Sequence, residues 1–91
     1  MFFAWDDDKA RSNLEKHDVS FEEAQTVFDD RFAGIRTDPD HSVGEVREII
    51  VGYSEKERLL LVSFTQRVGI IRIISARLLT RRERKAYEEE S

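Results

Sequence analysis

The stretch EVREIIVGYSEKERLLLVSFTQRVGIIRIIS, residues 45–75, decides the fold that this sequence predicts. Three runs within it are rich in β-branched and other large apolar residues, and they span residues 45–53, 58–65 and 70–75. Only a short polar turn and a short turn containing Gly69 separate these runs. Sequential strands with such links pair as an antiparallel meander, since a parallel connection needs a crossover of about a dozen residues or more.

Two helix starts precede this meander. Asp6 or Asp7 can cap a helix over residues 8–17, whose apolar stripe is thin. Ser20 and Glu23 form a capping box, in which each side chain satisfies the other residue's backbone N–H group. The helix that follows buries one face, made of Phe21, Ala24, Val27 and Phe28.

The remaining segments complete an α+β pattern. Residues 2–5 and 31–36 are typical of strands, residues 37–40 form a turn, and a second capping box at residues 80–83 opens a helix to about residue 89. We predict one domain, residues 1–91, in which an antiparallel sheet carries two N-terminal helices on one face and a C-terminal helix at its edge or end. The predicted core consists of Trp5, Leu14, Phe21, Val27, Phe28, Ile49, Val51, Leu59, Leu61, Ile71 and Ile73.

The composition excludes several classes of function. No cysteine is present, so disulfide scaffolds, thiolate zinc sites and thiol catalysis are excluded. No apolar run approaches the ~20 residues that span a bilayer, and the N-terminus lacks the features of a signal peptide. We therefore expect a soluble cytoplasmic protein. Neither a nucleophile elbow nor a phosphate loop occurs, and the two histidines give little support for a metal site, so we predict neither metal nor cofactor.

Positive charge is concentrated late in a chain whose formal net charge is −4. Residues 67–85 hold seven of the fifteen basic residues and one acidic residue, whereas residues 1–66 hold eight basic and fifteen acidic residues. Arg72 interrupts an apolar strand and lies either on a solvated sheet face or over a concave site, and Arg77 follows where the strand ends. Because guanidinium groups bind phosphate in bidentate fashion, this cluster predicts an anion site without specifying the anion.

Other side chains that could take part in catalysis or binding can also be explained by structural roles. His17 could act as a general acid or base, or could lie at a helix C-terminus where the dipole favours positive charge. His41 is typical of a polar turn, and Glu83 is expected to cap its helix rather than to act as a base. Lys9, Asn13 and Lys16 share the polar face of the first helix.

Two motifs resemble a known family. KARSNLEKHDVSFEEAQTVFDD, residues 9–30, followed by RIISARLLTRRERKAYEE, residues 72–89, is similar to the BrnT toxins of type II toxin–antitoxin modules, which have a RelE-like ribonuclease fold. The chain departs from the family at Asp18, where Gly is usual, and at Leu78 and Leu79, where the pair is commonly Arg-Ala.

The resemblance implies an endoribonuclease that cleaves messenger RNA and arrests growth. It also implies neutralisation by a BrnA-type antitoxin with a ribbon-helix-helix DNA-binding part, so that the complex contacts operator DNA through the antitoxin and represses its own operon. In such an enzyme the 2′-hydroxyl attacks the adjacent phosphate without a metal ion.

The resemblance and the charge pattern together place the site between the first helix and the end of the last strand. We expect Arg72 and Arg77 to bind the scissile phosphate. The candidates for proton transfer or further phosphate contact are Lys9, Lys16 and His17, and those for RNA binding are Asn13, Arg81, Arg82 and Lys85. Leu78 and Leu79 either dock the antitoxin or pack the last helix onto the sheet. A non-enzymatic RNA-binding module and a degenerate toxin that keeps only antitoxin binding remain alternatives.

Overall fold

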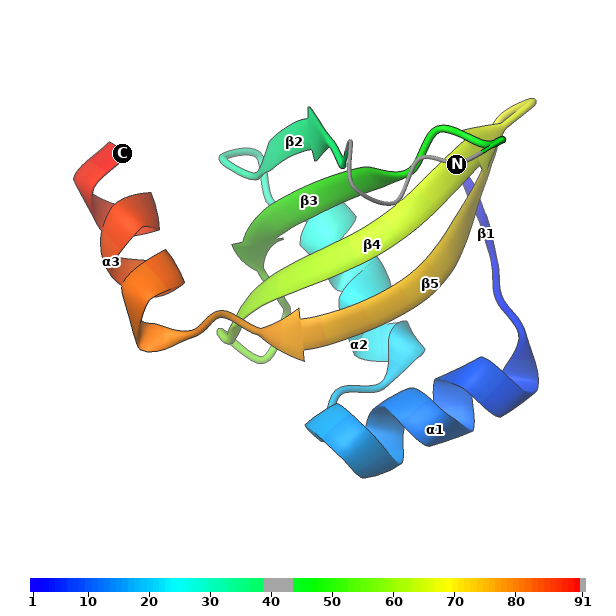
Figure 1. Ribbon diagram of the computed structural model, residues 1–91, viewed down its shortest axis with the longest axis horizontal. Helices are drawn as coiled ribbons and strands as arrows, with labels where there is room; N and C mark the ends of the chain where they lie inside the picture. The colour runs from blue at the N-terminus through cyan, green and yellow to red at the C-terminus, as the bar shows by residue number, and fades with distance from the viewer. Residues whose placement is uncertain (39–43, 91) are drawn as a thin grey trace.

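The chain forms a five-stranded sheet with helices at one side and a third helix beyond its end (Figure 1). This computed structural model describes residues 1–38 and 44–90. The elements in chain order are β1 (Phe2–Ala4), α1 (Asp7–His17), α2 (Phe21–Thr26), the 3₁₀ turn η1 (Val27–Asp29), β2 (Gly34–Thr37), β3 (Glu48–Tyr53), β4 (Leu59–Arg67), β5 (Ile70–Leu78) and α3 (Arg81–Glu90). Pro39 and Asp40 of the predicted turn lie outside the described residues, as does His41.

The strand order is β1-β5-β4-β3-β2. β3 to β5 form the predicted antiparallel meander, and β2 pairs with β3 in antiparallel fashion, whereas β1 pairs with β5 in parallel. The sheet is therefore mixed rather than wholly antiparallel. A short link dictates strand direction only between neighbours in sequence, and β1 reaches the meander through two helices. The predicted α+β class is confirmed.

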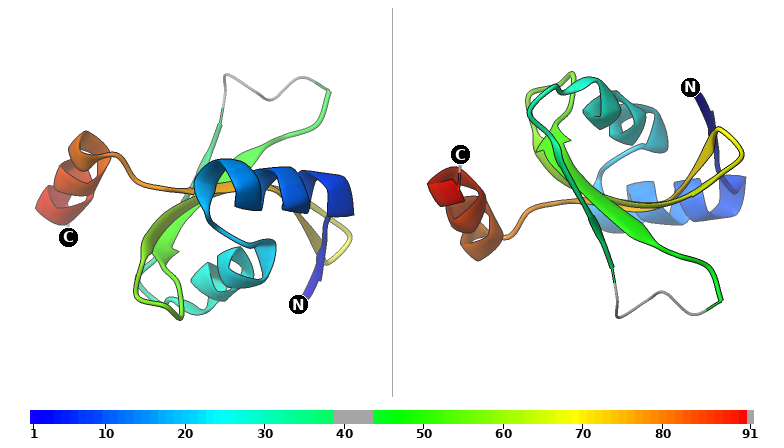
Figure 2. Two further views of the ribbon diagram at one scale, coloured as in Figure 1. Left: turned by 90° about the horizontal axis from the view of Figure 1, so that it is seen from below. Right: turned by 90° about the horizontal axis from the view of Figure 1, so that it is seen from above.

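The helices take different positions around the sheet (Figure 2). α2 lies behind the sheet in the view of Figure 1, α1 runs beside β5, and α3 projects past the end of β5. The face of the sheet that α2 covers is called the helix face below, and the opposite one the open face. Figure 1 looks onto the open face.

An aspartate caps each end of α1. The Asp6 carboxylate accepts hydrogen bonds from the backbone N–H groups of Asp8 and Lys9, at 2.9 and 3.0 Å. At the other end Asp18 adopts the left-handed conformation with φ +56° and donates its N–H to the Leu14 carbonyl. This conformation favours glycine, which is the residue usual there in the family that the sequence resembles. The prediction that Leu14 is a core residue is wrong, since it is 48% exposed and the buried residue of α1 is Asn13.

The capping box of α2 is only half formed. Ser20 accepts from the Glu23 N–H at 3.0 Å, as predicted. The Glu23 carboxylate does not return to Ser20. It is buried and accepts hydrogen bonds from the Arg58 guanidinium and the Ser54 hydroxyl instead. The hydrogen bonds from Arg58, opposed by burial, hold the pKa of Glu23 below its ordinary value. This network ties α2 to the β3–β4 turn.

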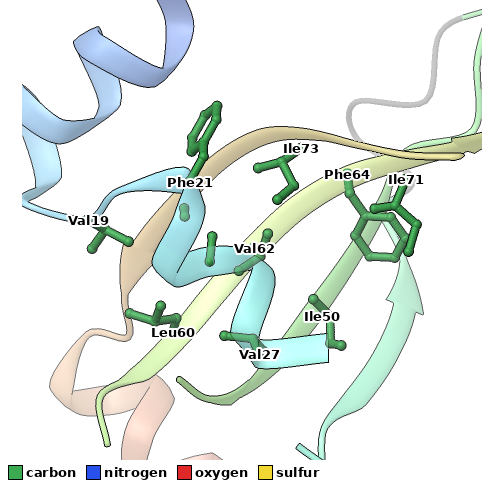
Figure 3. Close-up of a cluster of buried hydrophobic side chains, with 11 residues drawn as sticks. Val19, Phe21, Val27, Ile50, Leu60, Val62, Phe64, Ile71 and Ile73 are labelled. Carbon is green, nitrogen blue, oxygen red and sulfur yellow. The ribbon is translucent and has the colours of Figure 1, made fainter. Parts of the chain in front are cut away.

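The core lies between α2 and the helix face (Figure 3). Its buried members are Val19, Phe21, Ala24, Val27, Ile50, Leu60, Val62, Phe64, Ile71, Ile73 and Ala76. Trp5 and Phe28, which the sequence predicted, are partly buried and pack against it. On β3 the predicted face is wrong, because Ile50 joins the core while Ile49 and Val51 lie on the open face. Strict alternation cannot tell which face of an apolar strand is covered.

Candidate functional site

A β-bulge places Arg72 and Arg77 on the same face of β5. Residues five apart in a regular strand point to opposite faces. Here the β4–β5 register shifts between Ser63 and Phe64, so that β5 contains one residue more than β4 at this point. Arg72 and Arg77 therefore both lie on the open face, while Ile73 and Ala76 both lie in the core.

Neighbouring strands add arginines to this face. Arg36 of β2 pairs with Ile49, and Arg67 of β4 pairs with Ile70, so both side chains lie opposite the core. Across the five strands that the structure describes, no open-face position carries an acidic residue. We call Arg36, Arg67, Arg72 and Arg77 the arginine face. Arg36 and Arg67 were not among the predicted site residues, because neither belongs to a motif and only the strand register brings them to the face of Arg72.

Arg72 is available to bind a ligand. It is exposed and makes no hydrogen bond or ion pair with the described residues. The pKa of Asp6 is lowered, first by the hydrogen bond from the Lys9 backbone and further by the positive charges of the Lys9 and Arg72 side chains. Asp6 thus links the start of α1 electrostatically to the middle of β5.

The side chain of Asn13 hydrogen-bonds to the backbone of two neighbouring segments. Its amide donates to the carbonyl oxygens of Val19 and Ala76, at 2.9 and 2.8 Å, and accepts from the Ala76 N–H at 3.0 Å. Only 7% of its surface is exposed and both hydrogens of its amide are engaged, so Asn13 has little left to offer RNA, and its predicted RNA-binding role stays a prediction. Its place beside β5 orients α1.

Asn13 divides the remaining polar residues of α1 into two flanks. Ala10 packs against the core, so Lys9 and Lys16 occupy the other flank of the helix, and both are exposed. His17 lies in the last turn of α1, half-buried, on the same flank as Ala10. The structure therefore separates His17 from the two lysines with which the sequence grouped it.

Arg77 is already paired. Its guanidinium donates to both carboxylate oxygens of Glu83, at 2.8 and 3.0 Å. Glu83 also accepts from the Thr80 N–H and donates its own N–H to the Thr80 hydroxyl, so the predicted capping box is confirmed. Hydrogen bonds from Arg77, opposed by burial and supported by Thr80, lower the pKa of Glu83 to about 2. Arg77 therefore fastens the first turn of α3 to β5.

A groove of about 630 Å³ separates α3 from the open face. Its lining includes Val51, Leu61 and Leu79 on the sheet side and Ala86 and Tyr87 on α3. The Tyr87 ring also meets that of Tyr53, with centroids 6.5 Å apart. Leu79 thus lies between the sheet and the last helix, while Leu78 is largely exposed.

The cations predicted on α3 are not near Arg72. The groove-facing residues of this helix are Glu83, Ala86, Tyr87 and Glu90, which recur at helical spacing. Arg81, Arg82 and Lys85 are exposed outside that face. Because α3 begins only after β5 has ended, these three cations lie further along the chain than Arg77, whereas Arg72 lies nearer the start of β5 (Figure 1).

Within residues 1–38 and 44–90, no group of three or more His, Asp or Glu side chains is placed to hold a metal ion. No helix in the same ranges is long and apolar enough to cross a membrane.

The geometry describes an α+β protein whose mixed sheet carries four arginines on the face opposite α2. Comparison with known proteins gives its family. The chain belongs to the family described as ribonuclease toxin, BrnT, of type II toxin–antitoxin systems, whose model matches residues 5–83. The fold is similar to the crystal structure of the Brucella abortus ribonuclease toxin BrnT, with a TM-score of 0.64 and 18% sequence identity over 89% of this chain and 100% of that one. No curated protein matches the sequence.

Proposed function

We propose that this chain is a cytoplasmic endoribonuclease that cleaves messenger RNA on the arginine face and thereby arrests growth. The observation that carries the proposal is Arg72, an exposed guanidinium without a hydrogen-bond partner among the described residues, on a sheet face whose described strand positions carry no acidic residue. A charged donor in this setting binds phosphate and stabilises the charge that develops on it. Membership of a ribonuclease toxin family supports RNA as the ligand.

The proposed reaction is attack of a 2′-hydroxyl on the adjacent phosphorus. A base removes the hydroxyl proton, the new bond joins the 2′-oxygen to phosphorus, and the bond to the 5′-oxygen breaks as an acid protonates that oxygen. The products are a 2′,3′-cyclic phosphate and a 5′-hydroxyl. Arg72 stabilises the pentacoordinate phosphorus, and Lys9 and Lys16 are the candidates for proton transfer or phosphate contact on that side of α1. His17 remains a candidate from the flank beside the core.

The ion pair of Arg77 gives it a different proposed role from the other arginines of this face. Glu83 accepts one hydrogen from each terminal nitrogen of the Arg77 guanidinium and the Leu78 carbonyl accepts another, so Arg77 has fewer donors left for a phosphate than Arg72. Arg72, Arg67 and Arg36 remain for the substrate on the described face. Arg81, Arg82 and Lys85 would then contact more distant parts of the RNA.

The proposed partner is a BrnA-type antitoxin with a ribbon-helix-helix part, through which the complex represses its own operon. The groove beside α3 and the exposed Leu78 support an apolar contact with that protein. Co-expression with the adjacent small open reading frame, followed by affinity capture of this chain, tests the partner. Absence of any co-purifying protein would contradict the module.

The activity is tested by inducing the chain alone in a bacterial host and mapping transcript ends. We expect growth arrest, with new 2′,3′-cyclic phosphate and 5′-hydroxyl ends. An RNA with a single 2′-deoxy nucleotide at the cut site should resist cleavage by the purified protein, because it lacks the nucleophile. New 5′-phosphate ends would contradict the proposed reaction.

A second candidate is a degenerate toxin that binds its antitoxin, or RNA, without cleavage. The observation that favours it is the engagement of Arg77 and Asn13 in structural contacts, which leaves fewer groups for catalysis and for RNA binding than the sequence predicted. Unimpaired growth and intact transcripts after induction would support this candidate over the enzyme.

A further inference from the structure

The tip of the β4–β5 hairpin carries exposed apolar side chains beside the arginine face. β1 runs along β5 there, so that Phe2 pairs with Ile70 and Phe3 with Ile71. The Phe3 ring contacts the Phe28 ring on the helix face, at 5.1 Å between centroids. Phe2 therefore lies on the open face, where it is 75% exposed. We call Phe2, Val68 and Ile70 together the tip platform.

Val68 occupies a conformation that its side chain disfavours. The hairpin turns through Val68 and Gly69, whose φ angles are +49° and +78°. Two-residue turns of this kind prefer Asn or Asp followed by Gly, and a β-branched residue at positive φ is strained. Val68 is nevertheless 93% exposed, so packing does not account for it. Strain at an exposed residue makes the tip of this hairpin a candidate for contact with a ligand.

Positive charge borders the platform. Arg67 precedes Val68 and pairs across the hairpin with Ile70. Arg72 follows Ile70 by two residues, or about 7 Å along the strand. No acidic residue occurs from Leu59 to Arg82, so both arms of the hairpin are free of negative side chains. Phe2 on the edge strand thus lies on one side of Ile70 and Arg67 on the other, with Arg72 further along β5. A ring with two guanidinium groups close by matches the chemistry of single-stranded RNA, whose bases stack on rings while its phosphates bind arginine.

We propose that the tip platform stacks an unpaired base of the RNA substrate on the Phe2 ring, while Arg67 and Arg72 bind the flanking phosphates. This inference rests on the proposed function and specifies its substrate as a segment that is single-stranded beside the cut. Stacking tolerates any base, so the platform selects for lack of pairing rather than for sequence.

The test measures affinity for a fluorescein-labelled 12-nucleotide RNA with 2′-O-methyl groups throughout, which cannot be cleaved by 2′-hydroxyl attack. We expect Phe2→Ala to weaken binding about 5- to 150-fold, and Phe2→Trp to restore it. Phe2→Leu should resemble Phe2→Ala, because it keeps an apolar side chain but no ring. Phe32→Ala is the matched control, since Phe32 is 77% exposed at the other edge of the sheet.

The salt dependence distinguishes stacking from loss of a charge contact. Phe2→Ala should leave the slope of log affinity against log salt unchanged, whereas Arg72→Ala should reduce it by about 0.7 for one lost phosphate contact. A 2-aminopurine base in the same RNA should be quenched by the wild-type protein and by Phe2→Trp, but not by Phe2→Leu.

Three results would overturn the proposal in different ways. If Phe2→Ala binds the RNA as tightly as wild type while Arg72→Ala does not, stacking on the tip platform is contradicted and RNA binding by the arginine face is supported. If Phe2→Ala weakens capture of the antitoxin but not of RNA, the platform is a protein contact. If the wild-type chain neither binds the probe nor cleaves RNA, the proposed function falls as well.

Discussion

The side chain of Asn13 hydrogen-bonds to both backbone groups of Ala76, as a residue of a neighbouring strand would. β1 covers the edge of β5 only as far as Arg72, so beyond that point the strand needs another partner. Asn13 supplies it from α1 and also binds the Val19 carbonyl. One amide thus joins the edge of the sheet, the first helix and the segment before the second.

Asn13→Ala should therefore lower the free energy of unfolding by about 2–4 kcal/mol, because it leaves several buried backbone groups without partners. Urea denaturation of the variant measures the loss, and Ser12→Ala on the exposed side of α1 is the control. Unchanged stability combined with weaker RNA binding would restore the RNA-contacting role that the sequence suggested for Asn13.

Arg72→Ala should reduce RNA cleavage by about 10²–10³-fold, because it removes a charged donor from the developing phosphorane. Stability should barely change, since Arg72 is exposed and unpaired among the described residues. Single-turnover cleavage of a defined transcript measures the effect. Arg11→Ala is the control, since Arg11 is an exposed α1 residue paired with Asp8. Equal rates for wild type and Arg72→Ala would show that the arginine face is not catalytic.

The sequence predicted elements well where local chemistry determines them. The caps at Asp6 and Thr80 and the three-strand meander follow from residues within a few positions of each other, and the structure has them. Glu23 shows the limit of such reasoning. Its spacing from Ser20 predicted a mutual cap, but burial beside Arg58 offered the carboxylate a stronger, charged partner.

The candidate site was harder to predict, because it depends on which face each strand presents. Alternation alone would have put Arg72 and Arg77 on opposite faces, and nothing local marks the bulge that unites them. For the same reason Arg36 was not predicted as a site residue, because its pairing with Ile49 follows only from the register of the folded sheet. Arg77 was identified as a cation at the strand's end, but its partner on α3 depends on how the next helix folds back.

Asp18→Gly should stabilise the protein by about 0.5–1 kcal/mol. Asp18 has φ +56°, a conformation that costs an L-residue energy but not glycine. The backbone carbonyl of Asp18, which accepts from Arg58, is kept in the variant. The midpoint of thermal unfolding should rise by a few degrees. Asp7→Gly at the other end of α1 should not raise it, and a lower midpoint for Asp18→Gly would contradict the assignment of strain to this residue.

Glu83 should make part of the stability depend on pH. Its pKa in the folded protein is about 2, below the ordinary value of 4.5, so the folded state favours the charged form. The stabilisation is therefore complete above about pH 4.5 and is lost as the pH falls toward 2. Because the Arg77 and Glu83 side chains are about one third exposed, at 36% and 34%, solvent screens the pair and the effect should be modest.

Glu83→Gln isolates this contribution. The variant should be less stable than wild type at pH 6, and the two curves of thermal midpoint against pH should converge as the pH approaches 2. Glu23 also has a lowered pKa, but it is present in both proteins, so its contribution cancels in the difference. Glu89→Gln, on the same helix and exposed, is the control and should follow the wild-type curve. Wild-type and Glu83→Gln curves that stay parallel from pH 6 to pH 2 would mean that the Arg77–Glu83 pair does not fasten α3 to the sheet.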